Sequence, residues 1–379
     1  MILFLIIFNG IFLSAHIYLY LHLRSALLTG KSRGAAAAVM LLLFGAFLLA
    51  GLGRRFLPFD FSAAAWRFGV WWFGFLFYAV LLLLLVDLVR AITWTVRRLS
   101  PGRRDTGFPA LRREGLLAVL LGVILLLFVG HLNARRPRVV ERELRLAPSC
   151  GPVENIDLML VSDIHLGAMV NRRILRRVVG EAESLRPDLI VLAGDIIDRD
   201  ARSLEDRRVR ELLARFQAPL GVYAVTGNHE FITGVEEAVA GLSRLGIIFL
   251  RDRAVKLDDS FYLVGREDIS GPRWGGDSLP LDEILDGIER RCPVIVVDHQ
   301  PRRIEEAAAA GADLVLSGHT HHGQLFPINL ITSSIYPVSW GYGRMEETKI
   351  YVSSGAGTWG PPVRVGNTPE IVLLRISFE

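Results

Sequence analysis

The sequence predicts a layered α/β domain that follows a membrane domain. The first third of the chain contains four long apolar runs. From about residue 153 onward, strand-like apolar runs alternate with helical patterns, which is typical of layered α/β folds. The last strand-like runs lie close together among turn residues, which favours antiparallel pairing within a second sheet.

Four runs are long enough to cross a bilayer, which requires about 20 apolar residues. They are 1–23, 35–53, 68–89 and 115–132, and they predict a four-span transmembrane domain over residues 1–132. The first run lacks the basic start and small-residue cleavage site of a signal peptide. Because 51% of all residues are hydrophobic and the mean hydropathy is +0.37, the chain is too apolar for an ordinary soluble enzyme. We expect a multi-pass integral protein of a bacterial-type inner or plasma membrane, in contact with the lipid bilayer.

Basic residues in the short loops predict the orientation, because loops rich in Lys and Arg stay in the cytoplasm. The loops after the first and third runs carry ten such residues, against eight on the opposite side. This count favours an extracytoplasmic globular domain. The net charge of +4 is therefore interpreted as a signature of membrane orientation. Because the chain lacks a basic tract interleaved with aromatic residues, we expect no nucleic acid partner.

Residues 133–152 form a basic, proline-containing segment that alternates in places like an edge strand. We interpret this segment as a linker that lies along charged headgroups, followed by a globular domain over 153–379. The two cysteines, Cys150 and Cys292, have no C-x-x-C spacing. A disulfide between them is the less favoured interpretation, so cysteine use does not indicate the compartment.

The globular domain is predicted to begin with a strand at 156–162 and a helix at 171–185. Further strands are expected at 188–193, 222–226, 293–297 and 312–317, with additional short strands at 247–250, 261–265, 348–353 and 370–377. The other helical patterns cover 204–216, 234–244, 280–290 and 301–310.

A short block of possible metal ligands follows each of five predicted strands: 156–162, 188–193, 222–226, 293–297 and 312–317. The blocks are Asp163-Ile164-His165, Gly194-Asp195-Ile196-Ile197-Asp198, Gly227-Asn228-His229-Glu230, Asp298-His299-Gln300 and Gly318-His319-Thr320-His321. Carboxylates, imidazoles and an amide without thiolate suit manganese, iron, zinc or magnesium, of which we favour manganese. Two such ions, about 3.5–4 Å apart, activate a water molecule and clamp the attacking and leaving oxygens of a phosphate ester. The pattern therefore predicts a hydrolase with two divalent metal ions.

The spacing of the ligands predicts how they are shared. Asp163 and His165 are two residues apart, so on an extended segment both would project from one face and share an ion. Asp195 is the natural carboxylate to bridge two ions. His229 directly follows a predicted ligand, and we expect it to protonate the leaving alkoxide or to stabilise charge on the phosphorus centre, with metal-bound hydroxide as the nucleophile. The remaining predicted ligands are Asn228, His299, His319 and His321.

In this order the blocks resemble the calcineurin-like metallophosphoesterase superfamily over roughly residues 153–379. The resemblance implies two β-sheets stacked between helices, with the metals at one edge. It also implies two ligand sets and a catalytic His229: one metal on Asp163, His165, Asp195 and His321, and the other on Asp195, Asn228, His299 and His319. Asp198 is interpreted as orienting the bridging region or capping a helix.

Two further stretches, GTWGPPVRVGNTPEI and GHTHHGQ, are similar to the membrane-associated branch of this superfamily that includes the YkuE-type enzymes. Some relatives in that branch are described as UDP-2,3-diacylglucosamine pyrophosphatases. We therefore expect hydrolysis of a phosphoester or pyrophosphate bond on a lipid-linked substrate, either such a nucleotide-linked lipid or a phospholipid. One alternative is a phosphodiesterase of soluble nucleotides that uses the spans as an anchor. Another is a non-catalytic membrane scaffold with a structural metal site. No protein partner is implied.

Residues around the blocks suggest how a substrate would be held. Arg273, Arg344 and Arg364 are candidate substrate-binding residues, because arginine binds phosphate oxygens bidentately. The alternative is that each is an ordinary surface arginine. Aromatic and glycine-rich stretches at 326–331, 336–342 and 358–361 would either form an apolar lip for an acyl chain or pack the second sheet.

Overall fold

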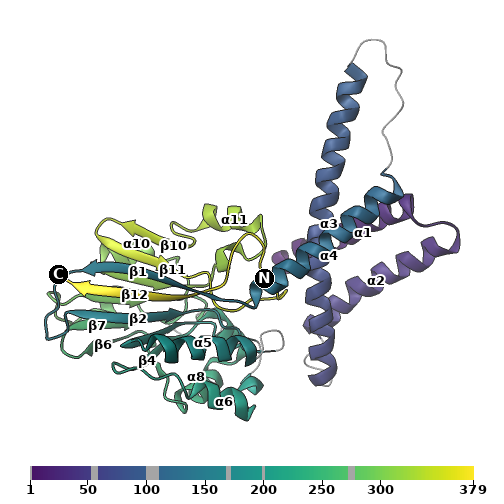
Figure 1. Ribbon diagram of the computed structural model, residues 1–379. Helices are drawn as coiled ribbons and strands as arrows, with labels where there is room; N and C mark the ends of the chain where they lie inside the picture. Colours follow the sequence, from purple (N-terminus) through teal and green to yellow (C-terminus); the bar gives the residue numbers. More distant parts are fainter. Residues whose placement is uncertain (1, 53–58, 100–110, 168–171, 199–200, 272–277) are drawn as a thin grey trace. The chain divides into compact units, whose positions relative to one another are not determined.

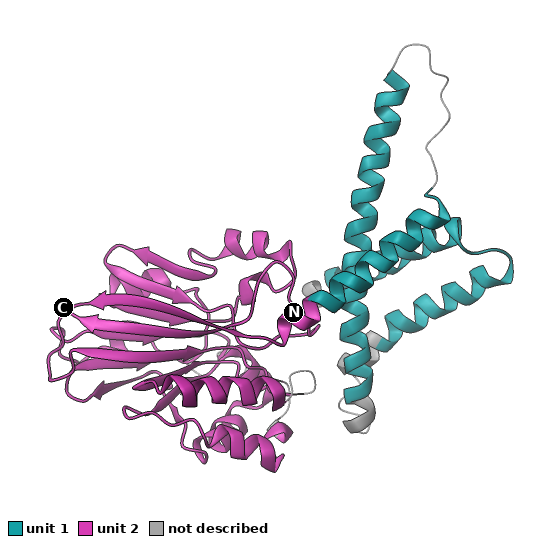
Figure 2. Cartoon of the chain, in the orientation of Figure 1, with its two compact units in different colours: residues 1–129 teal, residues 130–379 magenta. Residues whose placement is uncertain are grey.

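The computed structural model describes residues 2–52, 59–99, 111–167, 172–198, 201–271 and 278–379. The chain divides into two compact units, residues 1–129 and residues 130–379, which are coloured separately in Figure 2. Unit 1 is helical, and every described strand lies in unit 2.

Unit 1 consists of long apolar helices. They are α1 (Ile2–Ala26), α2 (Lys31–Leu52), α3 (Phe59–Leu99) and α4 (Arg113–Ala134), the last of which ends inside unit 2. Over the described residues, three segments are long and apolar enough to cross a membrane: Ile6–Ala26, Ala63–Leu99 and Arg113–Ala134. The expected count of four spans is therefore corrected to three over these residues. The expected span 35–53 coincides with α2 up to Leu52, and its last residue, 53, lies outside the described residues; α2 begins with Lys31 and Arg33, followed by a run of alanines.

Polar side chains inside unit 1 are paired with one another, as expected for costly groups in spanning helices. Asp87 of α3 accepts a hydrogen bond from the Tyr18 hydroxyl at 2.7 Å and lies 3.1 Å from Nε2 of His22. Asp87 also forms an ion pair with Arg90. These contacts join α1 to α3.

Unit 2 contains two stacked six-stranded sheets (Figure 1). The strands of the first sheet are, in order across it, β1 (Arg138–Leu146), β12 (Glu370–Phe378), β2 (Asn155–Val161), β3 (Leu189–Ala193), β4 (Val222–Val225) and β5 (Ile248–Phe249). Those of the second are β10 (Gly341–Met345), β11 (Thr348–Val352), β9 (Leu314–Ser317), β8 (Val294–Val297), β7 (Phe261–Gly265) and β6 (Arg253–Leu257). Strands β2 to β5 run parallel, as do β7, β8, β9 and β11. The stacked mixed sheets confirm the predicted fold class.

Helices cover the outer face of each sheet. Helices α5 (Arg172–Leu185), α6 (Arg207–Leu213) and α8 (Val235–Ser243) pack on the first sheet, and α9 (Leu281–Ile284) and α10 (Ile304–Ala309) on the second. A third apolar core fills the space between the sheets. The expected helix 280–290 is only one turn long, because the chain turns at Gly287, where φ is +79°. Two short helices, α7 (Asn228–Thr233) and α11 (Ile328–Ile335), were not predicted.

The segment 133–152 is more than the expected linker, because β1 forms within it. Strand β1 pairs in parallel with β12 along its whole length. Leu144 and Leu146, which alternate with charged residues, are buried in the core between the sheets. The alternation seen in the sequence therefore marks an edge strand whose apolar side chains join the core.

Cys150 and Cys292 form a disulfide, which corrects the less favoured status of this pairing in the sequence analysis. The two residues are 142 positions apart in the chain, but their Cα atoms lie 5.1 Å apart. Cys150 precedes β2 of the first sheet and Cys292 precedes β8 of the second. The bond therefore ties the two sheets together at the ends where these strands begin.

Candidate metal centre

The five blocks gather because each follows the carboxyl end of a parallel strand. Ser162 follows β2, Gly194 follows β3 and Thr226 follows β4 in the first sheet, while Asp298 follows β8 and Gly318 follows β9 in the second. Parallel strands present these ends at a common edge, where ligand sites of α/β folds form. The possible ligands from both sheets therefore lie together at the carboxyl ends of these strands.

Two glycines of the blocks are required by close packing. A Cβ atom on Gly227 would lie 2.2 Å from Oδ1 of Asp195, and one on Gly318 would lie 1.7 Å from Oγ of Ser162. Neither distance is sterically allowed. Any larger residue at these positions would displace the aspartates that the blocks supply.

The ligand segments are not extended, contrary to the expectation for Asp163 and His165. Asp163 has φ of 54°, His165 of 53° and Asp195 of 52°, all in the left-handed region. Non-glycine residues in this region are uncommon and concentrate at functional sites. The two side chains of the first block therefore converge through a tight left-handed turn.

One group of possible ligands combines Asp163, His165 and His321, whose ligand atoms lie within 4.8 Å of one another. Nε2 of His321 is 3.2 Å from Oδ1 of Asp163 and 3.0 Å from Nε2 of His165. Two imidazole lone pairs cannot face each other at that distance without a proton or a cation between them. All three residues are buried, so a cation here would be held away from bulk water.

A second group combines Asp195, His299 and His319. Nδ1 of His299 donates to the carbonyl of Ala193 at 2.7 Å, which leaves the lone pair on Nε2. That Nε2 lies 3.2 Å from Oδ2 of Asp195. A metal-binding histidine commonly donates its other N–H in this way, which fixes its orientation.

The unpaired polar atoms of the site suit divalent cations. Among the described residues, Oδ1 of Asp163, Oδ1 of Asn228 and Nε2 of His299 are buried without a hydrogen-bond partner. Burying such atoms unpaired is costly, and metal coordination is one way to satisfy them. Their oxygen and nitrogen chemistry, without thiolate, matches the borderline and hard divalent metals.

His229 forms a third group of possible ligands with His165 and Asp195, and it is held by Asp198. Its Nδ1 is 2.8 Å from Oδ1 of Asp198, and its backbone N–H donates to Oδ1 of Asp195 at 2.8 Å. Burial alone would lower the pKa of His229, but the carboxylates of Asp195 and Asp198 outweigh burial and raise that pKa to about 9. His229 is therefore favoured in its protonated form, able to donate a proton.

The charged groups of the site shift one another's protonation. Burial raises the pKa of Asp163 and Asp195, but the surrounding histidines lower both by more, so both pKa values lie below the ordinary range. Burial lowers the pKa of His319 to about 3 and that of His321 to about 4. The site thus favours ionised carboxylates and neutral imidazoles at these positions, which are the forms that bind metals.

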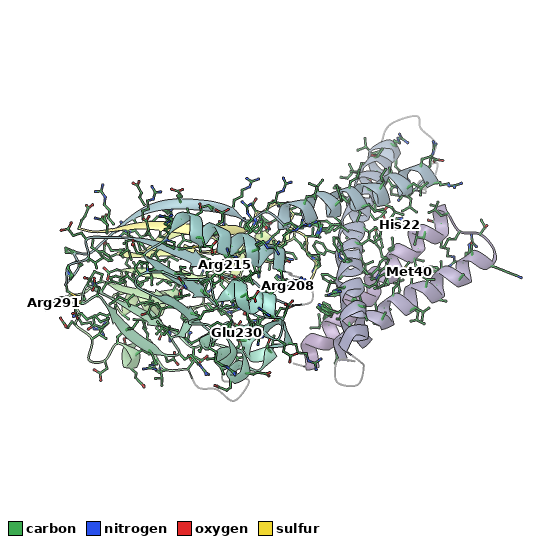
Figure 3. All side chains as sticks on the ribbon, turned by 60° about the horizontal axis from the view of Figure 1, so that its bottom comes forward. His22, Met40, Arg208, Arg215, Glu230 and Arg291 are labelled. Carbon is green, nitrogen blue, oxygen red and sulfur yellow. A yellow bond between two sulfur atoms is a disulfide. The ribbon has the colours of Figure 1, made fainter. Side chains whose placement is uncertain are left out.

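Glu230 has a role that sequence reasoning missed. This residue, labelled in Figure 3, is fully buried, and its carboxylate accepts hydrogen bonds from the backbone N–H groups of Asp195, Ile197 and Gly227 at 2.8–2.9 Å. Burial and the nearby Asp195 raise its pKa to about 7. Glu230 joins the second and third blocks, and its place at the end of the G-N-H-E block was the only signal of this.

Two other residues of the blocks support the site from a distance. Asp298 accepts two hydrogen bonds from Arg303, at 2.7 and 3.0 Å. The amide of Gln300 donates to both carboxylate oxygens of Asp268 at 3.0 Å. They flank His299 and hold its segment in place.

The site opens into a cavity of about 280 Å³. His165, Asp195, Asn228, His229, His319 and His321 form its polar side. Ile328 and Thr332 of α11, together with Tyr336 and Trp359, form a less polar side. Residues from all three stretches predicted as an apolar lip or as packing therefore lie at the cavity or on its border.

Of the three candidate arginines, the two that the structure describes do not line this cavity. Arg273 lies outside the described residues. Arg344 is exposed on β10, where it donates to the carbonyl of Glu346 and to the carboxylate of Glu347. Arg364 is fully buried, which corrects its expected role as a phosphate-binding residue.

Arg364 instead supports a metal ligand. Its guanidinium donates to the backbone carbonyl of His321 at 3.0 Å and to the carbonyls of Gly355 and Gly357 at 3.1 and 2.6 Å. The nitrogen that donates to Gly355 and Gly357 also lies 3.1 Å from Nδ1 of His321. Burial lowers the pKa of Arg364 to about 10, so the side chain stays charged at neutral pH.

Comparison with known proteins shows which family this chain resembles. The profile of the family described as "Calcineurin-like phosphoesterase" matches residues 156–323. A "Transmembrane protein with metallophosphoesterase domain" from Danio rerio is 33% identical over 278 residues, which cover 70% of this chain and 63% of that protein. The chain thus spans less than two thirds of that relative.

Two bacterial relatives match over more of their own length. An "Uncharacterized metallophosphoesterase" from Aquifex aeolicus is 35% identical over 267 residues, covering 69% of this chain and 98% of that protein. A "UDP-2,3-diacylglucosamine pyrophosphatase LpxG" from Chlamydia trachomatis is 23% identical over 317 residues, covering 68% of this chain and 94% of that protein.

Proposed function

Because the chain belongs to the calcineurin-like phosphoesterase family, we propose that it hydrolyses a phosphoester or pyrophosphate bond of a lipid-linked substrate with the help of two divalent metal ions. The observation that carries this proposal is the convergence of both ligand groups and His229 on one cavity. A structural metal site would need neither the cavity nor a histidine oriented by its own carboxylate. This argues against the non-catalytic scaffold.

The residues of the site divide the chemistry among them. Asp163, His165 and His321 would hold one cation, and Asn228, His299 and His319 the other, with Asp195 placed between them. Cations bound there would activate water and neutralise charge on the phosphoryl oxygens. Manganese remains our preferred metal, and its identity is part of the proposal.

His229 would act on the leaving group. The contact between Asp198 and Nδ1 leaves Nε2 of His229 available to donate a proton to the departing oxygen. The positive charge of the imidazolium would also stabilise the phosphoryl transition state. Arg364 and Glu230 would act indirectly, by holding the backbone segments that carry the ligands.

Three features support a lipid-linked substrate. The chain carries three helices able to cross a membrane over its described residues. The cavity is bordered by Ile328, Tyr336 and Trp359, whose apolar surfaces could contact an acyl chain. The chlamydial relative is named for a lipid-linked nucleotide.

The disulfide supports an extracytoplasmic active site, in agreement with the count of basic residues. Disulfides form and persist in oxidising compartments and are rare in the cytosol. An enzyme outside the cytoplasm would meet exported phospholipids or carrier-lipid phosphates. UDP-2,3-diacylglucosamine is the second candidate, favoured by the chlamydial relative, and it would require the active site to face the cytoplasm.

Two measurements test this proposal. Reporter fusions at Glu379, one active only outside the cytoplasm and one fluorescent only inside, determine the side. The purified full chain with Mn²⁺ is then assayed for the product each substrate would give: a head-group fragment from a phospholipid, phosphate from a carrier-lipid phosphate, a nucleotide from UDP-2,3-diacylglucosamine and p-nitrophenol from bis-p-nitrophenyl phosphate. We expect release from a lipid substrate that His229→Gln lowers by about a hundredfold or more. A chain that hydrolyses none of the four would refute the proposal.

A further inference from the structure

Exposed apolar side chains of unit 2 concentrate around helix α11. Among the residues of 130–379 that the structure describes, twelve large apolar side chains are exposed, and seven of them come from 326–342 and position 359. Five of these define what we call the α11 surface: Phe326 (49% exposed), Leu330 (63%), Ile331 (57%), Ile335 (53%) and Trp359 (42%). Contiguous exposed apolar patches of this kind mark interaction sites.

The α11 surface is held in place by backbone contacts. The Gln324 side chain donates to the carbonyls of Trp359 and Pro361 at 2.8 and 2.9 Å and accepts from the Trp359 N–H at 3.0 Å. The N–H of Phe326 donates to the carbonyl of Val365 at 2.9 Å. None of the eight residues of α11, all of them described, is buried, so its apolar side chains do not serve the core.

A second set of hydrogen bonds connects the segment that holds the α11 surface to the end of a spanning helix. The last turn of α4, residues 130–134, belongs to unit 2, as Figure 2 shows. The carbonyl of Gly130 accepts from the N–H of Arg364 at 3.0 Å, and Asn133 donates to the carbonyls of Arg364 and Asn367 at 3.1 and 2.7 Å. A Cβ atom on Gly130 would lie 2.6 Å from Val363, so the helix backbone packs directly on this segment.

Val365 therefore lies between two features: the place where α4 ends and the place where α11 is attached. Three arginines, Arg135, Arg136 and Arg138, follow the end of α4 and are suited to anionic headgroups. Tryptophan and aliphatic side chains beside such cations are typical of the membrane interface.

We propose that the α11 surface rests in the lipid bilayer, so that α11 is an interfacial helix beside the metal centre. The occupant is the bilayer itself, because the surface is continuous with the end of a spanning helix. This inference deepens the proposed function. Ile328 and Thr332, on the neighbouring side of α11, line the metal cavity, so a lipid would pass from the bilayer to the metals along one helix.

The test places a fluorophore on the α11 surface of the full chain. Ile331→Cys is labelled with bimane without reductant, so that the disulfide-bonded Cys150 and Cys292 do not react, and the protein is placed in nanodiscs of phosphatidylcholine and phosphatidylglycerol. Ile248→Cys is the matched control, because Ile248 is 47% exposed but lies on β5, at the far edge of the first sheet. Lipids with a nitroxide on the acyl chain should quench bimane at position 331 by about half or more and leave position 248 unchanged.

Equal, weak quenching at both positions would overturn the proposal and leave a protein partner or a second copy as the occupant. The kinetic counterpart uses Ile331→Asp. The ratio of hydrolysis of a lipid-presented to a soluble substrate should fall about tenfold in this variant and stay constant in Ile248→Asp. An unchanged ratio would also count against bilayer contact. Quenching does not depend on catalysis. An inactive parent protein would therefore refute the proposed function, while the quenching result would still test bilayer contact of the α11 surface.

Discussion

Oδ1 of Asp198 lies 2.8 Å from Nδ1 of His229. The contact keeps one proton of the imidazolium on Nδ1 and leaves the other on Nε2, turned away from the carboxylate. His229 follows Asn228 in sequence, so this one hydrogen bond would distinguish the proposed proton donor from the proposed metal ligand beside it. Asp198 is therefore a positioning residue for the proposed proton transfer.

Replacing Asp198 should impair catalysis without emptying the site. Asp198→Ala is expected to lower kcat by about 10–100-fold, the usual effect of removing a group that orients an active residue. Asp198→Asn keeps an oxygen that accepts from Nδ1 and should retain more activity. Metal content by mass spectrometry should match the parent in both variants. A metal-depleted Asp198→Ala would instead make this residue part of the metal binding itself.

Glu230→Gln should destabilise unit 2. A glutamine presents an N–H₂ group where one carboxylate oxygen now accepts a backbone N–H, so at least one buried donor loses its partner. Such a loss costs about 1–3 kcal/mol in the free energy of unfolding. Urea titration followed by fluorescence measures it. Glu236→Gln is the control, because Glu236 is an exposed partner of Arg251, and its change should stay within about 0.5 kcal/mol. Equal effects of the two substitutions would contradict the assigned role.

Arg364→Ala should be far more damaging than Arg344→Ala. The first leaves the carbonyls of His321, Gly355 and Gly357 without their donor, at a cost of about 1–3 kcal/mol for each buried group left unpaired. The second removes an exposed ion pair worth at most about 1 kcal/mol. Unfolding curves and metal content compare them. If Arg364→Ala kept both at the parent level, the support of His321 would be disproved.

Chelation should lower the unfolding temperature of the parent protein, because cations that bind only the folded state stabilise it by about 2.7 kcal/mol at a hundred times their dissociation constant. Asp195→Asn should abolish this response to EDTA, since Asp195 contributes to both ligand sets in the proposal. His322→Ala serves as the control, because the His322 ring packs against Trp340 and His322 belongs to none of the ligand groups. Differential scanning fluorimetry is the measurement. An EDTA response that survives in Asp195→Asn would argue against a shared carboxylate.

The cysteines should resist alkylation until a reductant is added. Maleimide–polyethylene glycol applied to freshly denatured protein should add no mass without reductant and two labels after it. Cys292→Ser should lower the free energy of unfolding by about 2–4 kcal/mol. The double variant with Cys150→Ser should behave like the single one, because both lack the same bond. Immediate labelling of both thiols would rule out the disulfide and remove its support for an extracytoplasmic site.

Much of unit 2 could be predicted because its strands are short apolar runs and its ligands follow them directly. Strands β2, β3, β4, β8 and β9 are almost entirely buried, and such runs have a plain signature in sequence. The ligand identities follow from the chemistry of the side chains. Their assignment to two sets of ions is still a prediction.

The rest depends on contacts between residues far apart in sequence. In sequence, Arg364 cannot be told from a surface arginine. Its role becomes visible only in the fold, where it contacts the carbonyls of Gly355 and Gly357. The partner of Cys150 is 142 residues away, and no local pattern reports that distance. The arginines of β1 made its segment look like a basic linker. The serine and threonine residues among the aliphatic residues of α11 obscured its helical pattern.

Strand β1 has a practical consequence for anyone who wishes to prepare the globular unit without its membrane part. A protein cut at residue 153, the boundary predicted from sequence, would leave the nine-residue β12 as a bare edge with the backbone groups that now pair with β1 unpaired. Such edges recruit strands from other copies and favour aggregation. A cut before Gly130 would keep β1 paired with β12, but the protein would also retain the apolar α11 surface. Soluble preparations should therefore begin near residue 130 and be handled in mild detergent.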